Sequence, residues 1–528
     1  MKSGSSEPVP DHGPADFMQN NWVRVVFRRR VYVICIIGLQ IGFILSVIAG
    51  SSLFFRYINW ILRALSIVVS LYLLNKKEKP AYKLTWIFLI LLFPIFGGFL
   101  YLVFCSQSNS RKLRRRIKSV GRRCGLFYFP SGDILPNLIL ERKNYLTQVR
   151  YLQDCAGYPV YDHTQTEYFD SGEGFFAKVL EELEKAERYI FMEFFILREG
   201  VMLNPIIDLL KRKARQGLDV RLIYDDLGCF MSLPPHFQQD LMMNGINCMV
   251  FNPFTPLLSS LQNNRDHRKI ISIDGKVAFT GGVNLADEYI NAFERFGHWK
   301  DAAIMLSGEA AWAFTLIFLH IWNLEQQEQD DYEAFYPWKD TPCEVPSDGY
   351  VQPYADNPIE SENVGEHVYI HIINNAKEYV YINTPYLVID DNLVSALTLA
   401  AKSGVDVRII TPHRWDKKIV AVTSRSYYRQ LLSAGVKVYE YSNGFNHSKT
   451  FVSDDMVATV GTINLDFRSL YLHFECGVCI YENSSVEAIK RDFLATLPRC
   501  HQITLQDCAR NTFQQILQDV LRLFAPLM

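Results

Sequence analysis

Hydrophobic residues form long unbroken runs in the first hundred residues and shorter, interrupted ones afterwards. Residues 31–55 and 84–105 contain no charged residue, and each run is longer than the roughly 18 apolar residues that a helix needs to cross a hydrocarbon core. Residues 57–74 are also apolar but are interrupted by Arg63, so they form a weaker candidate span. The pattern predicts N-terminal transmembrane helices within a membrane region at residues 31–105.

Basic residues flank these runs on both sides. Residues 1–30 form a polar arm that ends in arginines, and residues 106–150 form a linker that contains a basic collar. The collar, residues 111–123, has eight Lys or Arg and no acid. With two crossings the arm, the collar and everything after it would lie on the cytoplasmic side, where positive charge is retained and where anionic lipids attract it. We expect a multi-pass protein of the cell membrane, although three crossings stay open.

The remaining chain contains an internal repeat. Apolar strand-like segments alternate with helix-like ones, and three segments recur in the same order about 180 to 190 residues later. This duplication predicts two α/β domains, at residues 151–340 and 341–528, each with a parallel or mixed sheet. If the copies pack about a pseudo-two-fold axis, their matching motifs can face one cleft. The matches are AERYIFMEFFIL (186–197) with AKEYVYINTPYL (376–387), GLDVRLIYDD (217–226) with GVDVRIITPH (404–413), and HRKIISIDGKVAFTGGVNL (267–285) with HSKTFVSDDMVATVGTINL (447–465).

The last match contains the pattern H-x-K-x4-D in both copies. Side chains alternate along a strand, so His267 and Lys269 share a face. Asp274 is followed by glycine between two apolar runs, which predicts a two-residue hairpin turn and a structural role for the aspartate. The second copy repeats the pattern in His447, Lys449 and Asp454.

The pattern favours phosphate chemistry over metal binding. Protonated lysine is a poor metal ligand, and no second His or Cys lies at a zinc-like spacing, so neither a metal nor another cofactor is expected. Lysine charge suits phosphate oxygens, while one histidine attacks phosphorus and the other transfers the proton. One copy alone would be an ordinary edge strand, but two matched copies indicate a shared active site.

Other polar residues near the motifs complete the candidate site. Asn284 and Asn464 follow small residues and can bind a phosphate oxygen. Asp301 and Glu475 occupy equivalent places, and we expect them to orient the histidines. Four histidines lack a counterpart in the other copy and are expected to be structural, and three acidic residues at strand ends fit either ligand binding or capping. These are His163, His298, His413 and His473, and Glu193, Asp225 and Asp226.

The cysteines and the C-terminus add two expectations. The 11 cysteines are scattered, and only Cys476 and Cys479 have C-x-x-C spacing, so reduced structural thiols are expected. Residues 513–527 have the spacing of an amphipathic helix, which we expect to pack on the second domain. The apolar loop 251–262 is a better candidate for lipid contact.

Taken with their order, these motifs resemble those of the phospholipase D superfamily, and more narrowly of the bacterial cardiolipin synthases. The resemblance covers residues 57–528 and implies duplicated phospholipase D-like αβ sandwich domains. It also implies that two phosphatidylglycerol molecules give cardiolipin and glycerol through a phosphatidyl-histidine. By this resemblance His267 is the nucleophile and His447 the general acid and then base, an assignment that near symmetry allows to be swapped. His473 departs from the family pattern, which has asparagine there.

Two other functions compete with this one. Water could replace the second lipid, giving a phospholipase D-type hydrolase or a membrane-tethered nuclease. A nuclease needs a basic cleft, yet Lys and Arg near the motifs do not exceed Asp and Glu, so no nucleic acid partner is expected. An inactive lipid-binding scaffold is opposed by the intact histidines and lysines. The expected partners are phospholipid substrates, chiefly phosphatidylglycerol, and the bacterial membrane, while the oligomeric state stays open.

Overall fold

The computed structural model describes residues 38, 41–42, 53–76, 79–95, 97–98, 101, 110–129, 134–253, 260–326, 330–360 and 362–528. The chain divides into two compact units, residues 1–106 with 254–262 and residues 107–253 with 263–528. In the first unit α2 (Leu53–Leu74) packs on α3 (Pro80–Leu92). No helix among the described residues combines the length and hydropathy that a membrane crossing requires. Most of the predicted span at 31–55 lies outside the described residues, as do residues 254–259 of the loop 251–262.

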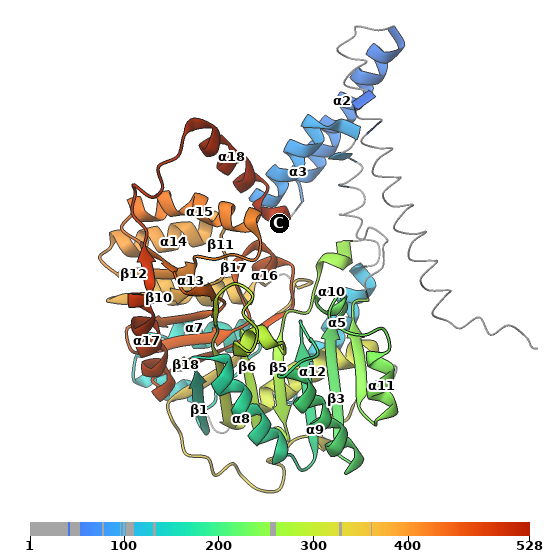
Figure 1. The fold of residues 1–528 in the computed structure, drawn as a ribbon, viewed down its shortest axis with the longest axis vertical. Helices are drawn as coiled ribbons and strands as arrows, with labels where there is room; N and C mark the ends of the chain where they lie inside the picture. The colour runs from blue at the N-terminus through green and yellow to red at the C-terminus, as the bar shows by residue number, and fades with distance from the viewer. Residues whose placement is uncertain are drawn as a thin grey trace, which may run out of the picture. The chain divides into compact units, whose positions relative to one another are not determined.

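The second unit contains two large sheets with the same strand order (Figure 1). The first runs β1-β8-β6-β5-β2-β3-β4 and the second β9-β18-β16-β15-β10-β12-β13, with β19 added at the edge. This correspondence confirms a duplicated α/β fold. The strands are β1 (Thr164–Phe169), β2 (Tyr189–Phe194), β3 (Asp219–Asp225), β4 (Asn247–Phe251), β5 (Lys269–Ile273), β6 (Val277–Gly281) and β8 (Ala303–Gly308), then β9 (Tyr350–Asp356), β10 (Tyr379–Asn383), β12 (Asp406–Pro412), β13 (Lys437–Tyr441), β15 (Thr450–Ser453), β16 (Val457–Gly461), β18 (Glu475–Tyr481) and β19 (Cys500–Gln502).

Both sheets are mixed, and helices cover them. Strands β2, β3 and β4 are parallel, whereas β5, β6, β8 and β1 join by antiparallel pairing. The two sheets also pack on each other, because β6 contacts β16 and β18, so the strands are apolar on both faces. The helices of this unit are α5 (Ser110–Gly125), α6 (Ile134–Leu140), α7 (Leu146–Arg150), α8 (Gly172–Glu184), α9 (Leu203–Arg215), α10 (Asp226–Cys229), α11 (Phe237–Met243), α12 (Glu309–Glu325), α13 (Val364–Asn375), α14 (Asp391–Lys402), α15 (Lys418–Ser433), α16 (Phe467–Tyr471), α17 (Ser484–Thr496) and α18 (Thr512–Leu523).

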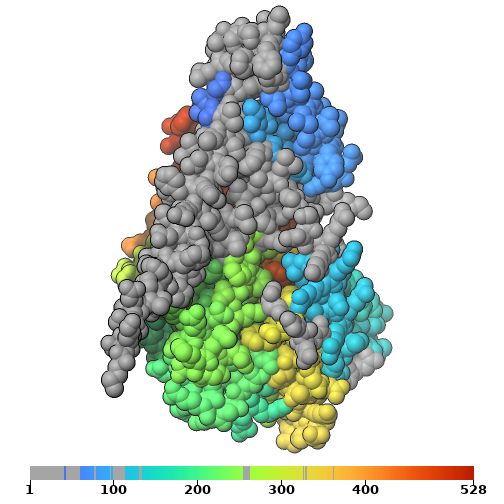
Figure 2. Space-filling view, turned by 90° about the vertical axis from the view of Figure 1, so that its right-hand side faces the viewer, coloured from blue at the N-terminus to red at the C-terminus, as the bar shows by residue number. Residues whose placement is uncertain are grey.

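The basic collar forms the amphipathic helix α5. Its apolar side chains Ile117, Val120 and Cys124 are buried in a cluster with α12, while its arginines lie on the outer side. Figure 2 shows this part of the chain in cyan on the surface, beside the yellow of the segment that follows α12. The collar is therefore part of the packed structure of the second unit. All nine described cysteines are free thiols, in line with the expectation from their spacing.

The hairpin that carries each motif aspartate has three residues in its loop, where two were predicted. Ile273 pairs with Val277, and Ser453 with Val457. Asp274 has a φ of 53° and Gly275 one of 69°, so two consecutive residues adopt the left-handed region. The third loop residue then closes the turn, since the amide of Lys276 donates to the Ile273 carbonyl at 3.0 Å.

Each motif aspartate ties its hairpin to the start of a neighbouring strand. The Asp274 carboxylate accepts the backbone N–H groups of residues 187, 188 and 189, each at 2.8 Å. Asp454 accepts those of residues 377, 378 and 379 at 2.7 to 3.0 Å. The aspartates therefore hold the ends of β2 and β10.

Replacing Asp274 with alanine is expected to lower the free energy of unfolding by about 3 kcal/mol, because three amides lose a charged acceptor. Asp454→Ala should cost less, because two of its three donors are solvent-exposed and can bind water. Chemical unfolding of the full chain in detergent measures both, with Asp274→Asn as the control that keeps one acceptor oxygen. Equal midpoints for the two alanine variants would contradict this explanation.

Candidate active site

The two motifs face one pocket of about 550 Å³ within the second unit, lined among others by His267 and His447. Backbone bonds between the copies bring them together. The His267 amide donates to the Phe474 carbonyl at 2.9 Å, and the His447 amide donates to the Lys300 carbonyl at 2.7 Å. Beside the second of these bonds, β14 (Gly444–Asn446) pairs in parallel with β7 (His298–Lys300). The histidines therefore lie just before β5 and β15, in segments paired with the opposite copy.

Each histidine is bonded to the carboxylate of the other copy. His267 Nδ1 lies 2.9 Å from Glu475 Oε1, and His447 Nδ1 lies 2.7 Å from Asp301 Oδ2. An ionised carboxylate can only accept, so Nδ1 carries the proton and the Nε2 lone pair stays available. Thr462 also donates its hydroxyl to Glu475, whereas its counterpart Gly282 has no side chain. Both carboxylates are fully buried.

Burial and nearby positive charge favour the neutral form of both imidazoles. Burial, and then the positive charges of Lys269 and Lys449, lower the pKa of His267 well below its usual value. Burial and the charge of Lys449 lower the pKa of His447 to about 4, although Asp301 opposes the shift. Burial tends to raise the pKa of Asp301, but His447 and Lys449 keep it below its usual value. Two uncharged imidazoles with fixed Nδ1 protons can act as nucleophile or base.

The motif lysines lie beneath the histidines. Lys269 Nζ donates to the His267 carbonyl at 2.6 Å, and Lys449 makes the equivalent bond to His447. Burial lowers the pKa of Lys269 to about 8 and that of Lys449 to about 7. Both lysines are 2% exposed, and neither lines the pocket. Their charge therefore acts on the site from behind the histidines.

The two asparagines differ in their bonding. Asn284 accepts from the Ile196 amide at 3.0 Å and donates to the Tyr289 hydroxyl at 2.7 Å. Asn464 has a buried side-chain oxygen without a hydrogen-bond partner in the structure. Both line the pocket, but Asn284 is held rigidly while Asn464 has bonding capacity to offer a substrate.

His473, which was expected to be structural, lines the pocket. Its ring is 5.6 Å from that of His267, and its Nδ1 is 3.7 Å from Glu475 Oε1. Arg468 Nε donates to its Nε2 at 3.2 Å, so Nδ1 carries the proton. Its position two residues before Glu475 could have predicted this place, because alternate residues of an extended chain point to the same side. In the other copy Trp299 precedes Asp301 in the same way, and its ring lies 5.3 Å from that of His447.

The pocket wall is basic, which the count of charges near the motifs did not predict. Four cationic residues and two acids line it. They come from segments far apart in the sequence, so no single stretch carries an excess of positive charge. Apolar side chains line much of the rest of the wall. The charged residues are Arg265, Arg295, Lys417, Arg468, Asp416 and Asp466, and the apolar ones include Phe195, Ile196, Leu227, Val388, Val420, Phe445 and Phe467.

The other candidate histidines and carboxylates have structural partners. His163 bonds to the Val345 carbonyl, His298 to the Tyr441 hydroxyl and His413 to the Glu440 carboxylate. The acidic residues at the strand ends are likewise engaged. Glu193 pairs with Arg268 at 2.6 Å, and Asp225 caps α10 through the amides of residues 227 and 228. None of these five residues lines the pocket.

One group among the described residues has metal-ligand geometry: His267, His473 and Glu475, whose ligand atoms lie within 4.8 Å of one another. The surroundings oppose a cation there. The positive charges of Lys269 and Lys449 act on His267, and that of Arg468 acts on His473. The site therefore favours an anion.

Comparison with known proteins identifies the family of this fold and site. Residues 179–308 and 369–497 match the family model described as cardiolipin synthase, PLD-like domain. Residues 64–104 match the model described as phospholipase D-nuclease N-terminal. Each of the two H-x-K-x4-D motifs thus lies within one of the two segments that match the family model.

Curated relatives span most of the chain. An uncharacterized protein of Streptococcus mutans is 42% identical over 87% of this chain and 99% of its own. A cardiolipin synthase of Alkalihalophilus pseudofirmus is 34% identical over 89% of this chain and 95% of its own. Among solved structures, a phosphatidylserine synthase of Haemophilus influenzae aligns with a TM-score of 0.52 and 15% identity, covering 72% of this chain and 97% of that one. The chain therefore belongs to the phospholipase D-like cardiolipin synthase family.

Proposed function

We propose that this chain is a phosphatidyltransferase that converts two phosphatidylglycerol molecules into cardiolipin and glycerol. One observation supports it above the others: two neutral imidazoles, each held by a carboxylate of the opposite copy, share one basic pocket. The curated cardiolipin synthases to which the chain is similar support the choice of lipid.

In the proposed reaction His267 Nε2 attacks the phosphorus of the first lipid, and the bond from phosphorus to the glycerol oxygen breaks. His447 enters as the imidazolium and gives its proton to that oxygen. A bound phosphate anion promotes this protonation, because an opposite charge raises the pKa of an imidazole. A hydroxyl of the second lipid then attacks phosphorus, the bond from phosphorus to nitrogen breaks, and His447 takes the hydroxyl proton. Both histidines return to their starting states.

The other residues stabilise charge and position the substrate. Lys269 and Lys449 supply positive charge from beneath the site, and the four cationic residues of the wall hold the two lipid phosphates. Asn464 lines the pocket, where its Nδ2 can donate to a phosphate oxygen, and Asn284 holds Tyr289 beside His447. Asp274 and Asp454 act only through the fold.

We further propose that the N-terminal region anchors the chain in the cell membrane, with the catalytic domains on the cytoplasmic side. The uncharged runs at 31–55 and 84–105 support this, as does the match of residues 64–104 to an N-terminal family model. Both lipids of the reaction stay in a bilayer, so an anchored enzyme meets them by diffusion within the membrane.

A hydrolase or nuclease is the second candidate, favoured by the basic wall of the pocket. Its many apolar wall residues favour lipid over nucleic acid. Purified full-length protein should be incubated with phosphatidylglycerol vesicles and the products followed by mass. Cardiolipin with equimolar glycerol is expected, and the double variant His267→Gln/His447→Gln is the control. Phosphatidic acid as the sole product would reject the transferase.

The profile of kcat/KM against pH should be a bell for the free enzyme. On the acid side the rate falls as His267 of the free enzyme gains a proton and loses its nucleophilic lone pair, at a pH well below the usual pKa of a histidine. Above pH 7 it falls as Lys449 and then Lys269 lose the charge that holds phosphate, with pKa values of about 7 and 8. Lys449→Arg should move the alkaline limb upward, because arginine does not deprotonate. A rate that keeps rising above pH 9 would contradict a charged role for the lysines.

A further inference from the structure

Helix α18 faces the wrong way for a helix on a water-soluble surface. Such a helix buries its apolar stripe and exposes its polar side. In α18 the apolar residues Phe513, Ile516, Leu517 and Val520 are 76%, 57%, 45% and 42% exposed. Their spacing of i, i+3, i+4 and i+7 places them on one side of the helix. No residue of α18 is buried.

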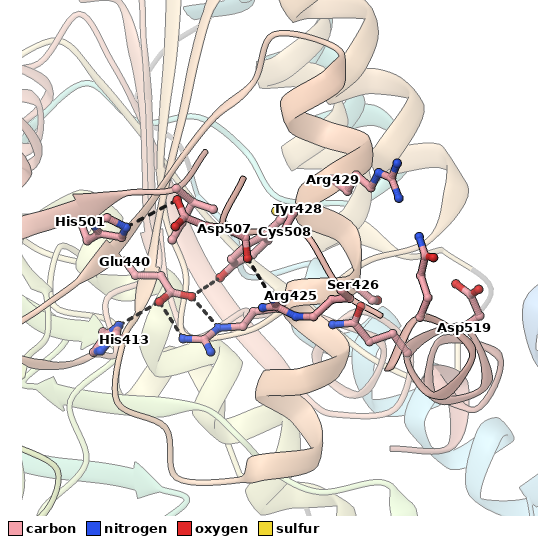
Figure 3. A pocket seen from close by; sticks show the side chains of 14 residues that line it. His413, Arg425, Ser426, Tyr428, Arg429, Glu440, His501, Asp507, Cys508 and Asp519 are labelled. Carbon is pink, nitrogen blue, oxygen red and sulfur yellow. Dashed lines mark hydrogen bonds and ion pairs between the residues drawn. The ribbon is translucent and has the colours of Figure 1, made fainter. Parts of the chain in front are cut away.

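The polar side of α18 faces the protein instead. Gln515, Gln518 and Asp519 line a cavity of about 290 Å³, whose other walls are α15, β13 and the segment 501–510. Figure 3 shows Asp519 across this cavity from the network of Glu440, Arg425 and His413. A polar cavity thus lies between α18 and α15, where a soluble protein would have a contact between apolar side chains.

The charges opposite Asp519 are largely paired among themselves. Glu440 accepts from Arg425 Nε at 2.8 Å and from Arg425 Nη2 at 2.7 Å, and His413 Nδ1 lies 2.9 Å from the same carboxylate. The carboxylate of Glu440 is therefore satisfied by Arg425 and His413. What remains unexplained is the exposed apolar side of the helix.

The helix leads directly into the active site. The last turn of the chain follows α18, and Ala525 and Met528 line the pocket that contains both catalytic histidines. The hydroxyl of Thr423 in α15 lies 3.5 Å from Met528 Sδ. Any surface that binds α18 is therefore brought to the wall of the pocket.

Further exposed apolar side chains adjoin the pocket. Leu227 lines the pocket itself. Phe293, Trp415 and Ile419 lie one or two residues along the chain from a lining residue, and Met231 lies three residues after Gly228. Basic residues stand at both ends of α18, with Arg510 two residues before its N-terminus and Arg522 in its last turn. A polar, basic pocket with an apolar border suits molecules that have an anionic head and apolar tails. The exposed residues are Leu227, Met231, Phe293, Trp415 and Ile419.

We propose that the outer side of α18 lies in the surface of a phospholipid bilayer and sets the active-site pocket against the lipid headgroups. Helices of this kind bury their apolar side at the boundary between headgroups and acyl chains, and basic residues bind anionic headgroups. The identity of the occupant rests on the proposed function, since the substrates are lipids. The sequence-based expectation that this helix packs on the second domain is confirmed, because α18 contacts α15, but its apolar side takes no part in that packing.

Photochemical crosslinking tests the contact without requiring turnover. A benzophenone amino acid replaces Leu517 in the full chain, which is reconstituted in phosphatidylglycerol vesicles and irradiated. We expect a mass increase of one lipid, and we expect none when the same group replaces Gln515 on the opposite side. A crosslink to residues of this chain's N-terminal unit, or to a second copy, would overturn the proposal. An inactive protein would still give the lipid adduct, so this test fails separately from the proposed function.

Kinetics supply a second test with a matched control. Ile516→Glu/Leu517→Glu adds two charges to the apolar side, whereas Gln514→Glu/Gln515→Glu adds the same charges to neighbouring exposed positions. The first variant should raise KM for vesicle-embedded lipid by about tenfold or more, since two large apolar side chains no longer enter the bilayer. Its kcat/KM for a short-chain phosphatidylglycerol dissolved as monomers should be unchanged. Equal KM values for the two double variants on vesicles would contradict a bilayer contact.

Discussion

Replacing His447 with glutamine is expected to leave a chain that forms the phosphatidyl-histidine but cannot complete the transfer. A synthetic lipid with p-nitrophenol as its leaving group needs no general acid, so His267 can still attack phosphorus. No base then remains to activate the second hydroxyl. We expect a burst of about one equivalent of p-nitrophenol per chain and a stable mass increase of one phosphatidyl group. Steady-state cardiolipin formation should fall by about 10⁴-fold.

The mirror variant, His267→Gln, is the matched control. It lacks the nucleophile, so neither burst nor mass increase is expected, and its steady-state loss should be equally large. If the burst appears in His267→Gln and is absent from His447→Gln, the two roles are exchanged. A burst in both variants would mean that neither histidine is the sole nucleophile.

The repeated motif explains why much of the fold was predictable. Three segments recur in one order, and a duplicated segment must fold alike, so two sheets with matched strand order follow. The predicted same-side placement of His267 and Lys269 also agrees with the structure, because both contact Phe195. The hairpin loop was predicted one residue too short, since Asp274 and Gly275 alone do not fix where pairing resumes.

What the sequence could not give depends on contacts between the copies. Asp301 and Glu475 were predicted as partners of the histidines, but local pattern does not say that each serves the opposite copy. The basic wall was missed for a similar reason, because Arg265 and Arg468 come from different domains. For α18 the spacing of apolar residues predicts which side is apolar, but the direction in which that side faces depends on what covers it. In each case the missing information is how distant segments pack.

The crossed pairing leads to the second large effect. Replacing Glu475 with glutamine removes the acceptor of the His267 Nδ1 proton and presents an amide that can also donate. The imidazole then loses its fixed tautomer, and kcat should fall by about 10³- to 10⁴-fold, as expected for an orienting carboxylate. KM should change little, because neither Glu475 nor Asp301 lines the pocket. Asp301→Asn should lower kcat by a similar factor through His447.

The two carboxylate variants should separate in the burst experiment, although they look alike in the steady state. Glu475→Gln should slow the release of p-nitrophenol itself, because it disorders the nucleophile. Asp301→Asn should leave the burst rate nearly unchanged and slow only the second step, because His447 is not needed for this leaving group. The conservative exchange Glu475→Asp, which keeps an acceptor, should restore part of the burst rate. A purely structural role would instead slow both steps equally in both variants, so the split between them ties each carboxylate to the histidine of the opposite copy.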